Sequence, residues 1–158
     1  VGFKHIAKLM LQGGVLIGGE ESGGIGLRGY LPERDGILMA LLTLEAMATQ
    51  GKGIQEILKR LERKYGRWSY MRRDLTVPFD RVNRVFQRLT TNPPSKIAGV
   101  PVRECKTLDG VKLIDRQDNW LLFRRSGTEP IVRIYAETPS RSRLPELMRA
   151  GIRLARTA

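Results

Sequence analysis

The stretch WLLFRRSGTEPIVRIYAE, residues 120–137, contains two runs rich in apolar, aromatic and β-branched side chains, separated by a short loop. Such runs, when bounded by glycine and proline, are typical of strands. Trp120 to Arg124 and Ile131 to Glu137 therefore predict two strands. Upstream, the runs Val100 to Lys106 and Val111 to Asp115 flank an Asp-Gly pair, which is a common hairpin turn. The four runs together predict a four-stranded, mostly antiparallel sheet.

Two helices are expected beside this sheet. One is predicted over Asp80 to Leu89, with four apolar side chains on one face, and the Asn-Pro-Pro that follows ends it. The last segment of the chain also carries one apolar helical face, formed by Leu144, Leu147, Met148, Ile152 and Ala155. An extended connector, Tyr70 to Pro78, precedes the first helix. We therefore predict a small α+β domain over residues 71–158.

Residues 1–70 have a different pattern, which predicts one strand followed by two helices. Val15 to Ile17 is a short apolar run that predicts a buried strand leading into a glycine-rich loop. A helix over Ile37 to Thr49, capped by Asp35 and closed by Gly51, is apolar on nearly every face and should be largely buried. A second, amphipathic helix follows it.

The glycine-rich loop GEESGG, residues 19–24, combines flexible backbone with carboxylates and a hydroxyl. Glycines let the backbone approach a ligand closely, and carboxylate and hydroxyl groups are suited to binding sugar hydroxyls. Glu20 and Ser22 are the candidate residues. The alternative is an ordinary polar turn whose glutamates face water.

The loop RRSGTEP, residues 124–130, combines two arginines, two hydroxyls and the backbone amides around a glycine. Arginine presents a planar fork that matches pairs of phosphate oxygens, and successive amides can form an anion nest. Because neighbouring residues of a strand point to opposite faces, we expect Arg124 to bind the anion and Arg125 to point elsewhere. The alternative is a tight β-turn with solvated arginines.

Composition narrows the function classes. The chain has 28 basic and 16 acidic residues, a formal net charge of +12, and most of the excess lies after residue 70. This balance suits an anionic partner. A single cysteine excludes an intramolecular disulfide framework, and one cysteine with one histidine does not make a zinc site. No apolar run is long enough to span a membrane, so we expect no membrane partner and a cytoplasmic location.

The two loops, in this order and at this spacing, resemble those of the α-D-phosphohexomutase superfamily, the phosphoglucomutases and phosphomannomutases. These enzymes carry a G-E-x-S-G sugar loop in a third domain and an R-x-S-G-T-E-P phosphate loop in a fourth, followed by a strand with a further arginine. The resemblance extends over essentially the whole chain. It implies that residues 1–70 are the C-terminal portion of the third domain, a mixed α/β domain that recognises the sugar, and that residues 71–158 are the fourth, a phosphate-binding α+β domain.

The resemblance also implies roles for individual residues. Glu20 and Ser22 would bind sugar hydroxyls, and Lys4 would lie near the reacting hydroxyl. The substrate phosphate would be bound by Arg124, Ser126, Gly127 and Thr128, with Arg133 supporting that loop or touching the phosphate. Relatives with a histidine after the S-G pair have their counterpart here at Gly24, so an acid/base role for that histidine does not transfer.

The family's phosphoserine loop and aspartate-rich metal loop are absent from this sequence. The resemblance therefore implies a fragment that is inactive alone and whose partners are a hexose phosphate and the missing N-terminal domains. The full-length enzyme would use Mg²⁺, with no ligand in this chain, and glucose 1,6-bisphosphate as its intermediate. Glu21 stands where glucosamine-type relatives tend to have glutamine, which favours hexose phosphates, glucose over mannose.

Two other function classes remain open at this level. One is a stand-alone module that binds sugar phosphates or other anions without catalysis. The other is a basic nucleic-acid-binding domain, which would carry aromatic side chains on an open sheet face for base stacking. Few aromatic residues fall on the predicted strands and no RNA-recognition string is present, so we expect no nucleic acid.

Overall fold

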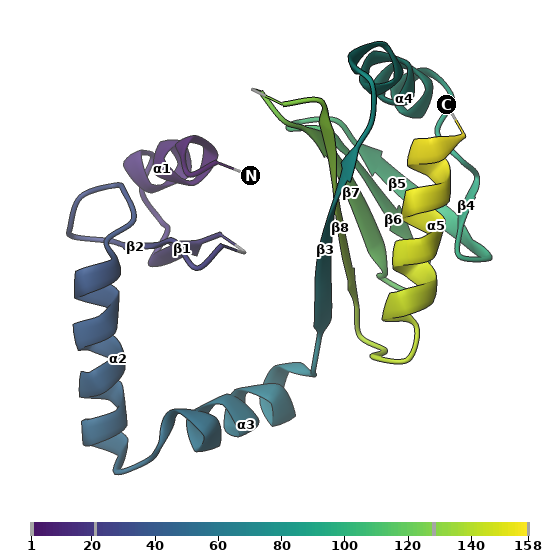
Figure 1. Ribbon diagram of the computed structural model, residues 1–158. Coiled ribbons are helices and arrows are strands. Elements are labelled where there is room, and N and C mark those ends of the chain that lie inside the picture. Colours follow the sequence, from purple (N-terminus) through teal and green to yellow (C-terminus); the bar gives the residue numbers. More distant parts are fainter. Residues whose placement is uncertain (1, 21, 128, 158) are drawn as a thin grey trace. The chain divides into compact units, whose positions relative to one another are not determined.

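The computed structural model describes residues 2–20, 22–127 and 129–157. The chain divides into two compact units, Val1–Glu62 and Arg63–Ala158. The first unit contains helix α1 (Lys4–Leu11), a short hairpin of β1 (Ile17–Gly19) and β2 (Ile25–Leu27), helix α2 (Gly36–Gln50) and all but the last turn of helix α3 (Ile54–Tyr65). Figure 1 shows their order along the chain.

The hairpin packs against α1 through glycine. A side chain at Gly18 would collide with Ile6, and one at Gly26 would lie 2.8 Å from Phe3 Cζ and 3.3 Å from Met10 Cε. The sequence predicted a buried strand over Val15 to Ile17, and this prediction is wrong. The strand begins at Ile17, pairs only with β2 among the described strands, and leaves Ile17 exposed.

Helix α2 begins and ends where its sequence predicts. Asp35 Oδ1 accepts hydrogen bonds of 2.9 Å from the amides of Ile37 and Leu38, and Gly51 closes the helix in the left-handed region at φ 59°. The expected burial of α2 is not found, since none of its residues is buried and Ile37, Leu41 and Leu44 are exposed, Ile37 at 79%. A helix that is apolar on all sides is buried only where neighbouring elements cover every side. The other described residues do not cover α2 in this way.

The second unit is built on one antiparallel sheet with the strand order β3-β8-β7-β6-β5-β4. Its elements, in chain order, are β3 (Ser69–Thr76), α4 (Phe79–Thr91), β4 (Lys96–Ile97), β5 (Val100–Lys106), β6 (Val111–Asp115), β7 (Trp120–Arg125), β8 (Ile131–Thr138) and α5 (Leu144–Arg156). The α+β class is confirmed, but in the part of the chain that the structure describes the sheet has six strands rather than four. The expected connector Tyr70 to Pro78 forms most of β3, which pairs with β8 along its whole length.

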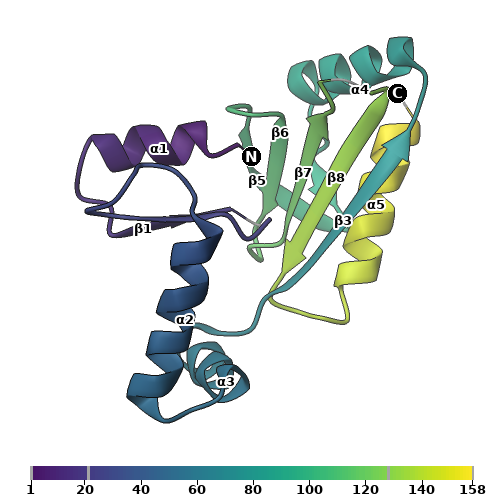
Figure 2. The same ribbon diagram turned by 60° about the vertical axis from the view of Figure 1, so that its left-hand side comes forward.

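Helices α4 and α5 pack on one face of the sheet, because their buried apolar side chains form a single core with the strands. Figure 2 shows α5 alongside β3 and α4 across one end of the strands. The predicted apolar face of α4 is buried through Val82, Val85, Phe86 and Leu89. Helix α5 packs closely on the sheet because Gly151 has no side chain, and an added Cβ would lie 2.9 Å from Ile134 and 3.1 Å from Leu121. The helices cover alternate residues of each strand, so the intervening residues lie on the opposite face.

A buried polar network fixes the turn between β6 and β7. Asp115 is fully buried and its carboxylate accepts hydrogen bonds from the backbone amides of Gln117 and Asn119 and from the Asn119 side chain. Thr138 at the end of β8 donates to Asn119 at 2.6 Å. These contacts set the register of β6, β7 and β8, and thereby the position of the loop at the other end of β7. In the described part of the chain, no helix is long and apolar enough to cross a membrane.

Candidate functional site

The two arginines of the RRSGTEP motif are the last residues of β7, and strand register places the first of them in a row of charged residues. Arg124 of β7 is paired with Arg133 of β8, and Arg133 with Asp74 of β3. The neighbouring pair in each strand, Phe123 and Ile134, is fully buried under the helices. Arg124, Arg133 and Asp74 therefore belong to the face that α4 and α5 do not cover.

Arg124 is held by a residue from the β5–β6 turn. Its Nε donates a hydrogen bond of 3.0 Å to Asp109 Oδ2, and both side chains are about three-quarters buried (23% and 25% exposed). The turn lies tightly against β7, because a side chain on Gly110, at φ 97°, would collide with the carbonyl oxygen of Phe123. The sequence identified Asp109 only as a turn residue, and nothing local to it indicates an arginine partner.

Arg125 points away from Arg124. Its guanidinium lies over the ring of Phe86 in α4, 5.1 Å from the ring centroid. The two arginines thus occupy opposite faces of β7, as the two-residue period of a strand requires. Arg125 contributes a cation–π contact to the packing of α4 on the sheet.

A cavity of about 670 Å³ lies at this end of the sheet, between α4, the β5–β6 turn and the loop after β7. Arg124, Arg125, Gly127 and Asp109 line it, with Phe86 and Thr90 on the helix side. Of the residues singled out from the sequence, the cavity brings together Arg124 and Gly127. Ser126 is buried beside it, with its backbone amide donating to Ile131 O, and Thr128 lies outside the described residues.

Arg133 does not line this cavity. Its Nε lies 4.0 Å from Asp74 Oδ2 and is buried without a hydrogen-bond partner among the described residues. Asp74 is engaged mainly by Arg72, which donates to both carboxylate oxygens at 2.9 and 2.8 Å. These hydrogen bonds lower the pKa of Asp74 and raise that of Arg72.

The glycine-rich loop in the first unit connects β1 and β2. The backbone amide of Glu20 donates to Gly24 O at 2.8 Å, and Gly23 N donates to Glu20 O at 3.0 Å, so the loop is a closed turn. Ser22 is exposed at its tip. The side chain of Glu20 is only 4% exposed, in contrast to a glutamate of an ordinary polar turn.

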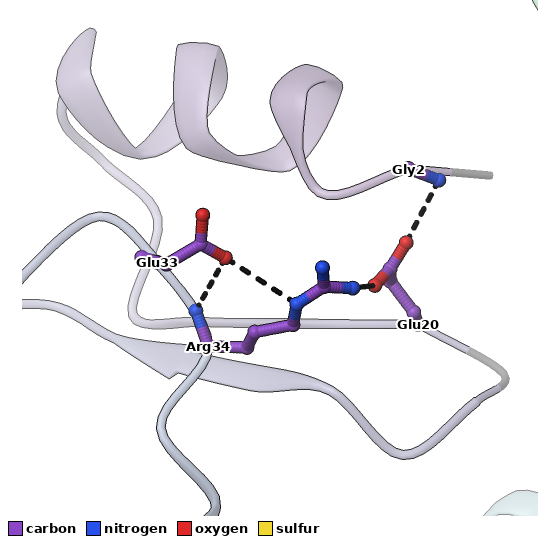
Figure 3. A network of polar contacts seen from close by, with 4 residues as sticks. All are labelled: Gly2, Glu20, Glu33 and Arg34. Atoms are coloured by element: carbon purple, nitrogen blue, oxygen red, sulfur yellow. Dashed lines mark hydrogen bonds and ion pairs between the residues drawn. The ribbon is translucent and has the colours of Figure 1, made fainter.

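The Glu20 carboxylate is bound on both oxygens (Figure 3). Oε1 accepts a hydrogen bond of 2.8 Å from the amide of Gly2, and Oε2 accepts one of 2.8 Å from Arg34 Nη1. Arg34 is in turn held by Glu33, whose Oε1 lies 2.9 Å from the Arg34 amide and 3.6 Å from its Nε. Sequence reasoning did not find Arg34, because only the fold brings its side chain to Glu20.

Lys4 is exposed at the first residue of α1. The adjacent His5 is partly buried, and its Nε2 has no hydrogen-bond partner among the described residues. The described residues contain no group of three or more histidine, cysteine, aspartate or glutamate side chains that could hold a metal ion. The described residues therefore do not fit a Mg²⁺ site.

Comparison with known domain families accounts for most of the chain. Residues 1–65 match the domain described as "Phosphoglucomutase/phosphomannomutase, alpha/beta/alpha domain III", and residues 81–152 match "Phosphoglucomutase/phosphomannomutase, C-terminal domain". The chain belongs to this family. The resemblance inferred from the two loops is thereby confirmed at the level of the phosphohexomutase superfamily.

Individual relatives agree with the assignment. The chain is 33% identical over its full length to a phosphoglucomutase/phosphomannomutase of Thermococcus kodakarensis, of which it covers 32%. It is 30% identical to a phosphoglucosamine mutase of Methanocaldococcus jannaschii, of which it covers 33%. A crystal structure from Thermus thermophilus, described as a phosphomannomutase, superposes with a TM-score of 0.72 at 38% identity, over 99% of this chain and 30% of the other. The chain thus spans about a third of the length of its phosphohexomutase relatives.

Proposed function

We propose that the full-length protein is a phosphohexomutase that interconverts hexose 1-phosphate and hexose 6-phosphate through a bisphosphate. The observation that carries this proposal is the pair of loops in the two family domains. One presents a buried carboxylate at Glu20, and the other presents Arg124 at the rim of a cavity beside Gly127. A mutase needs both kinds of group, because it must hold a phosphate firmly and recognise the hydroxyls of a sugar ring.

The phosphate that is not being transferred is assigned to the loop after β7. Arg124, Ser126, Gly127 and Thr128 would bind it through the guanidinium, hydroxyl and amide groups, with Arg133 supporting the loop from the adjacent strand. This arrangement fixes the phosphate by charge-assisted hydrogen bonds while leaving the sugar ring to reorient. The same loop can therefore accept either end of a hexose bisphosphate.

The sugar hydroxyls are assigned to Glu20 and Ser22 of the hairpin loop. Each carboxylate oxygen has two lone pairs, so Glu20 can accept hydrogen bonds from two hydroxyls while keeping its contacts to Gly2 and Arg34. Lys4, exposed at the start of α1, is the weaker candidate for a group near the reacting hydroxyl.

Phosphoryl transfer itself is assigned to parts of the full-length protein outside this chain. A serine phosphate would pass to the substrate, the bisphosphate would reorient, and the other phosphate would return to the serine. Mg²⁺ would neutralise charge during transfer in the full-length enzyme. The residues of the two loops contribute positioning, which accounts for much of the catalysis of phosphoryl transfer.

Among possible substrates we favour glucose phosphates over mannose and glucosamine phosphates. The test is a comparison of kcat/KM for glucose 1-phosphate, mannose 1-phosphate and glucosamine 1-phosphate with the full-length protein. The highest value for glucose 1-phosphate supports the proposal. A higher value for either of the other two overturns the substrate choice, and no turnover of any of the three overturns the mutase assignment.

A further inference from the structure

The contact between Glu20 and Arg34 has the features of a positioning interaction. A carboxylate as deeply buried as Glu20 is costly unless its charge is compensated and its oxygens are hydrogen-bonded. Arg34 Nη1 supplies the compensating charge at 2.8 Å, and the amide of Gly2 satisfies the other oxygen at 2.8 Å. The two contacts hold both oxygens and so fix the plane of the carboxylate.

Gly24 is what allows Arg34 to reach across the loop. An added Cβ at this position would lie 2.8 Å from Arg34 Cδ and 3.2 Å from Glu20 Oε2. Any side chain at residue 24 would therefore displace Arg34, Glu20 or both. Arg34 can therefore contact Glu20 only because residue 24 has no side chain.

We propose that Arg34 is the positioning residue for Glu20, so that it sets the direction in which the carboxylate meets the sugar hydroxyls. This inference rests on the proposed function of the hairpin loop. Glu20 would touch the sugar, and Arg34 would act through it. The arginine fork holds one carboxylate oxygen and leaves a lone pair on each oxygen for a hydroxyl.

The test measures how tightly the full-length protein binds two probes, one with a sugar and a phosphate and one with a phosphate alone. The first is 1-deoxyglucose 6-phosphate, which lacks the C1 hydroxyl and cannot accept a phosphoryl group there. The second is inorganic phosphate. Arg34→Met should weaken binding of the first probe about tenfold, as expected for loss of one charged hydrogen bond, and leave the Kd of phosphate unchanged. Arg34→Lys should recover part of the loss, because it retains the charge without the planar fork.

Two further variants make the result specific. Arg28→Met is the matched control, since Arg28 is exposed in the same unit and its side chain makes no hydrogen bond or ion pair to a described residue. It should leave both affinities unchanged. Gly24→Ala, which leaves Arg34 in the chain, should reproduce the loss caused by Arg34→Met. The double variant should be no worse than either single one, because both remove the same contact.

The outcomes separate this inference from the proposed function. If Glu20→Gln weakens the sugar phosphate while Arg34→Met and Gly24→Ala do not, the positioning role is overturned and the sugar loop stands. If Glu20→Gln leaves binding of 1-deoxyglucose 6-phosphate unchanged, the assignment of the sugar loop itself is overturned. Equal weakening of phosphate and sugar phosphate by Arg34→Met also overturns the positioning role, because a general loss of structure or charge would act on both.

Discussion

Arg124 Nε and Asp109 Oδ2 lie 3.0 Å apart, although the two residues are 15 positions apart in the sequence. The ion pair joins the end of β7 to the turn between β5 and β6, at the rim of the same cavity. Arg125, the next residue along the chain, lies instead over Phe86 on the helix side. The two arginines of the motif therefore have different surroundings, and only one of them belongs to the row of charged residues on the open face of the sheet.

Replacement of each arginine in the full-length protein should separate their roles. Arg124→Ala is expected to weaken binding of glucose 6-phosphate by about 2–4 kcal/mol, because it removes a charge-assisted pair from an anion site. Arg125→Ala should have a much smaller effect on binding and should mainly reduce stability through its lost contact with Phe86. Isothermal titration calorimetry measures the first effect and thermal unfolding the second.

The reverse pattern would show that the anion approaches from the helix side of β7. If both variants bind glucose 6-phosphate as tightly as the parent protein does, this loop does not bind the phosphate.

Residues 1–158 alone should not interconvert glucose 1-phosphate and glucose 6-phosphate in the presence of Mg²⁺. The sequence contains no phosphoserine loop or aspartate-rich metal loop, and the described residues do not form a metal cluster. A coupled assay for glucose 6-phosphate, with the full-length protein as the positive control, measures this. Turnover that copurifies with the chain and disappears in an Arg124→Ala chain would contradict the expectation.

Gly151→Ala should destabilise the second unit even though alanine favours helices. The new methyl group would lie 2.9 Å from Ile134 and 3.1 Å from Leu121, in the core between α5 and the sheet. We expect overpacking to cost about 1–3 kcal/mol and to outweigh a gain in helix propensity of about 1 kcal/mol. Urea unfolding followed by tryptophan fluorescence measures the change.

Gly36→Ala is the matched control, since an added Cβ at the first residue of α2 has nothing within 4 Å. Its stability should be unchanged or slightly raised. A Gly151→Ala variant as stable as the control would mean that α5 can move away from the sheet at little cost.

The hydrogen bonds between Arg72 and Asp74 should make part of the stability depend on pH. They lower the pKa of Asp74 in the folded protein below its unfolded value of about 4. The contribution is therefore present above about pH 4 and is lost as the pH falls through the folded pKa. The difference in unfolding free energy between the parent protein and Asp74→Asn should be below about 1 kcal/mol at neutral pH, because the pair is exposed, and should shrink in acid.

Asp80→Asn, at an exposed pair with Arg84 in α4, provides a control on the same unit. The difference in unfolding free energy between the parent protein and Asp74→Asn could instead stay constant between about pH 7 and about pH 3, as closely as it does for Asp80→Asn. That result would contradict a contribution from the lowered pKa of Asp74.

Much of the second unit follows from local sequence. The strands Val100–Lys106 and Val111–Asp115 have the predicted bounds, and α4 buries the predicted apolar face. In the first unit, Asp35 and Gly51 close the two ends of α2 as expected. Caps, turns and apolar periodicity depend on residues a few positions apart, so they can be recognised without knowledge of the fold.

The two loop motifs and the family were likewise determined by sequence alone, since they depend on residue types at fixed spacing. The tertiary structure decided the rest. Whether Tyr70 to Pro78 is a connector or a strand depends on β8, far along the chain, whose backbone N–H and C=O groups form hydrogen bonds with it.

The contacts of the site side chains were also decided by the tertiary structure. Asp109 contacts Arg124, and Arg34 contacts Glu20, and each pair joins two different loops or strands. The burial of α2 depends on what surrounds it rather than on its own composition. Such contacts join segments distant along the chain, and no local pattern encodes them.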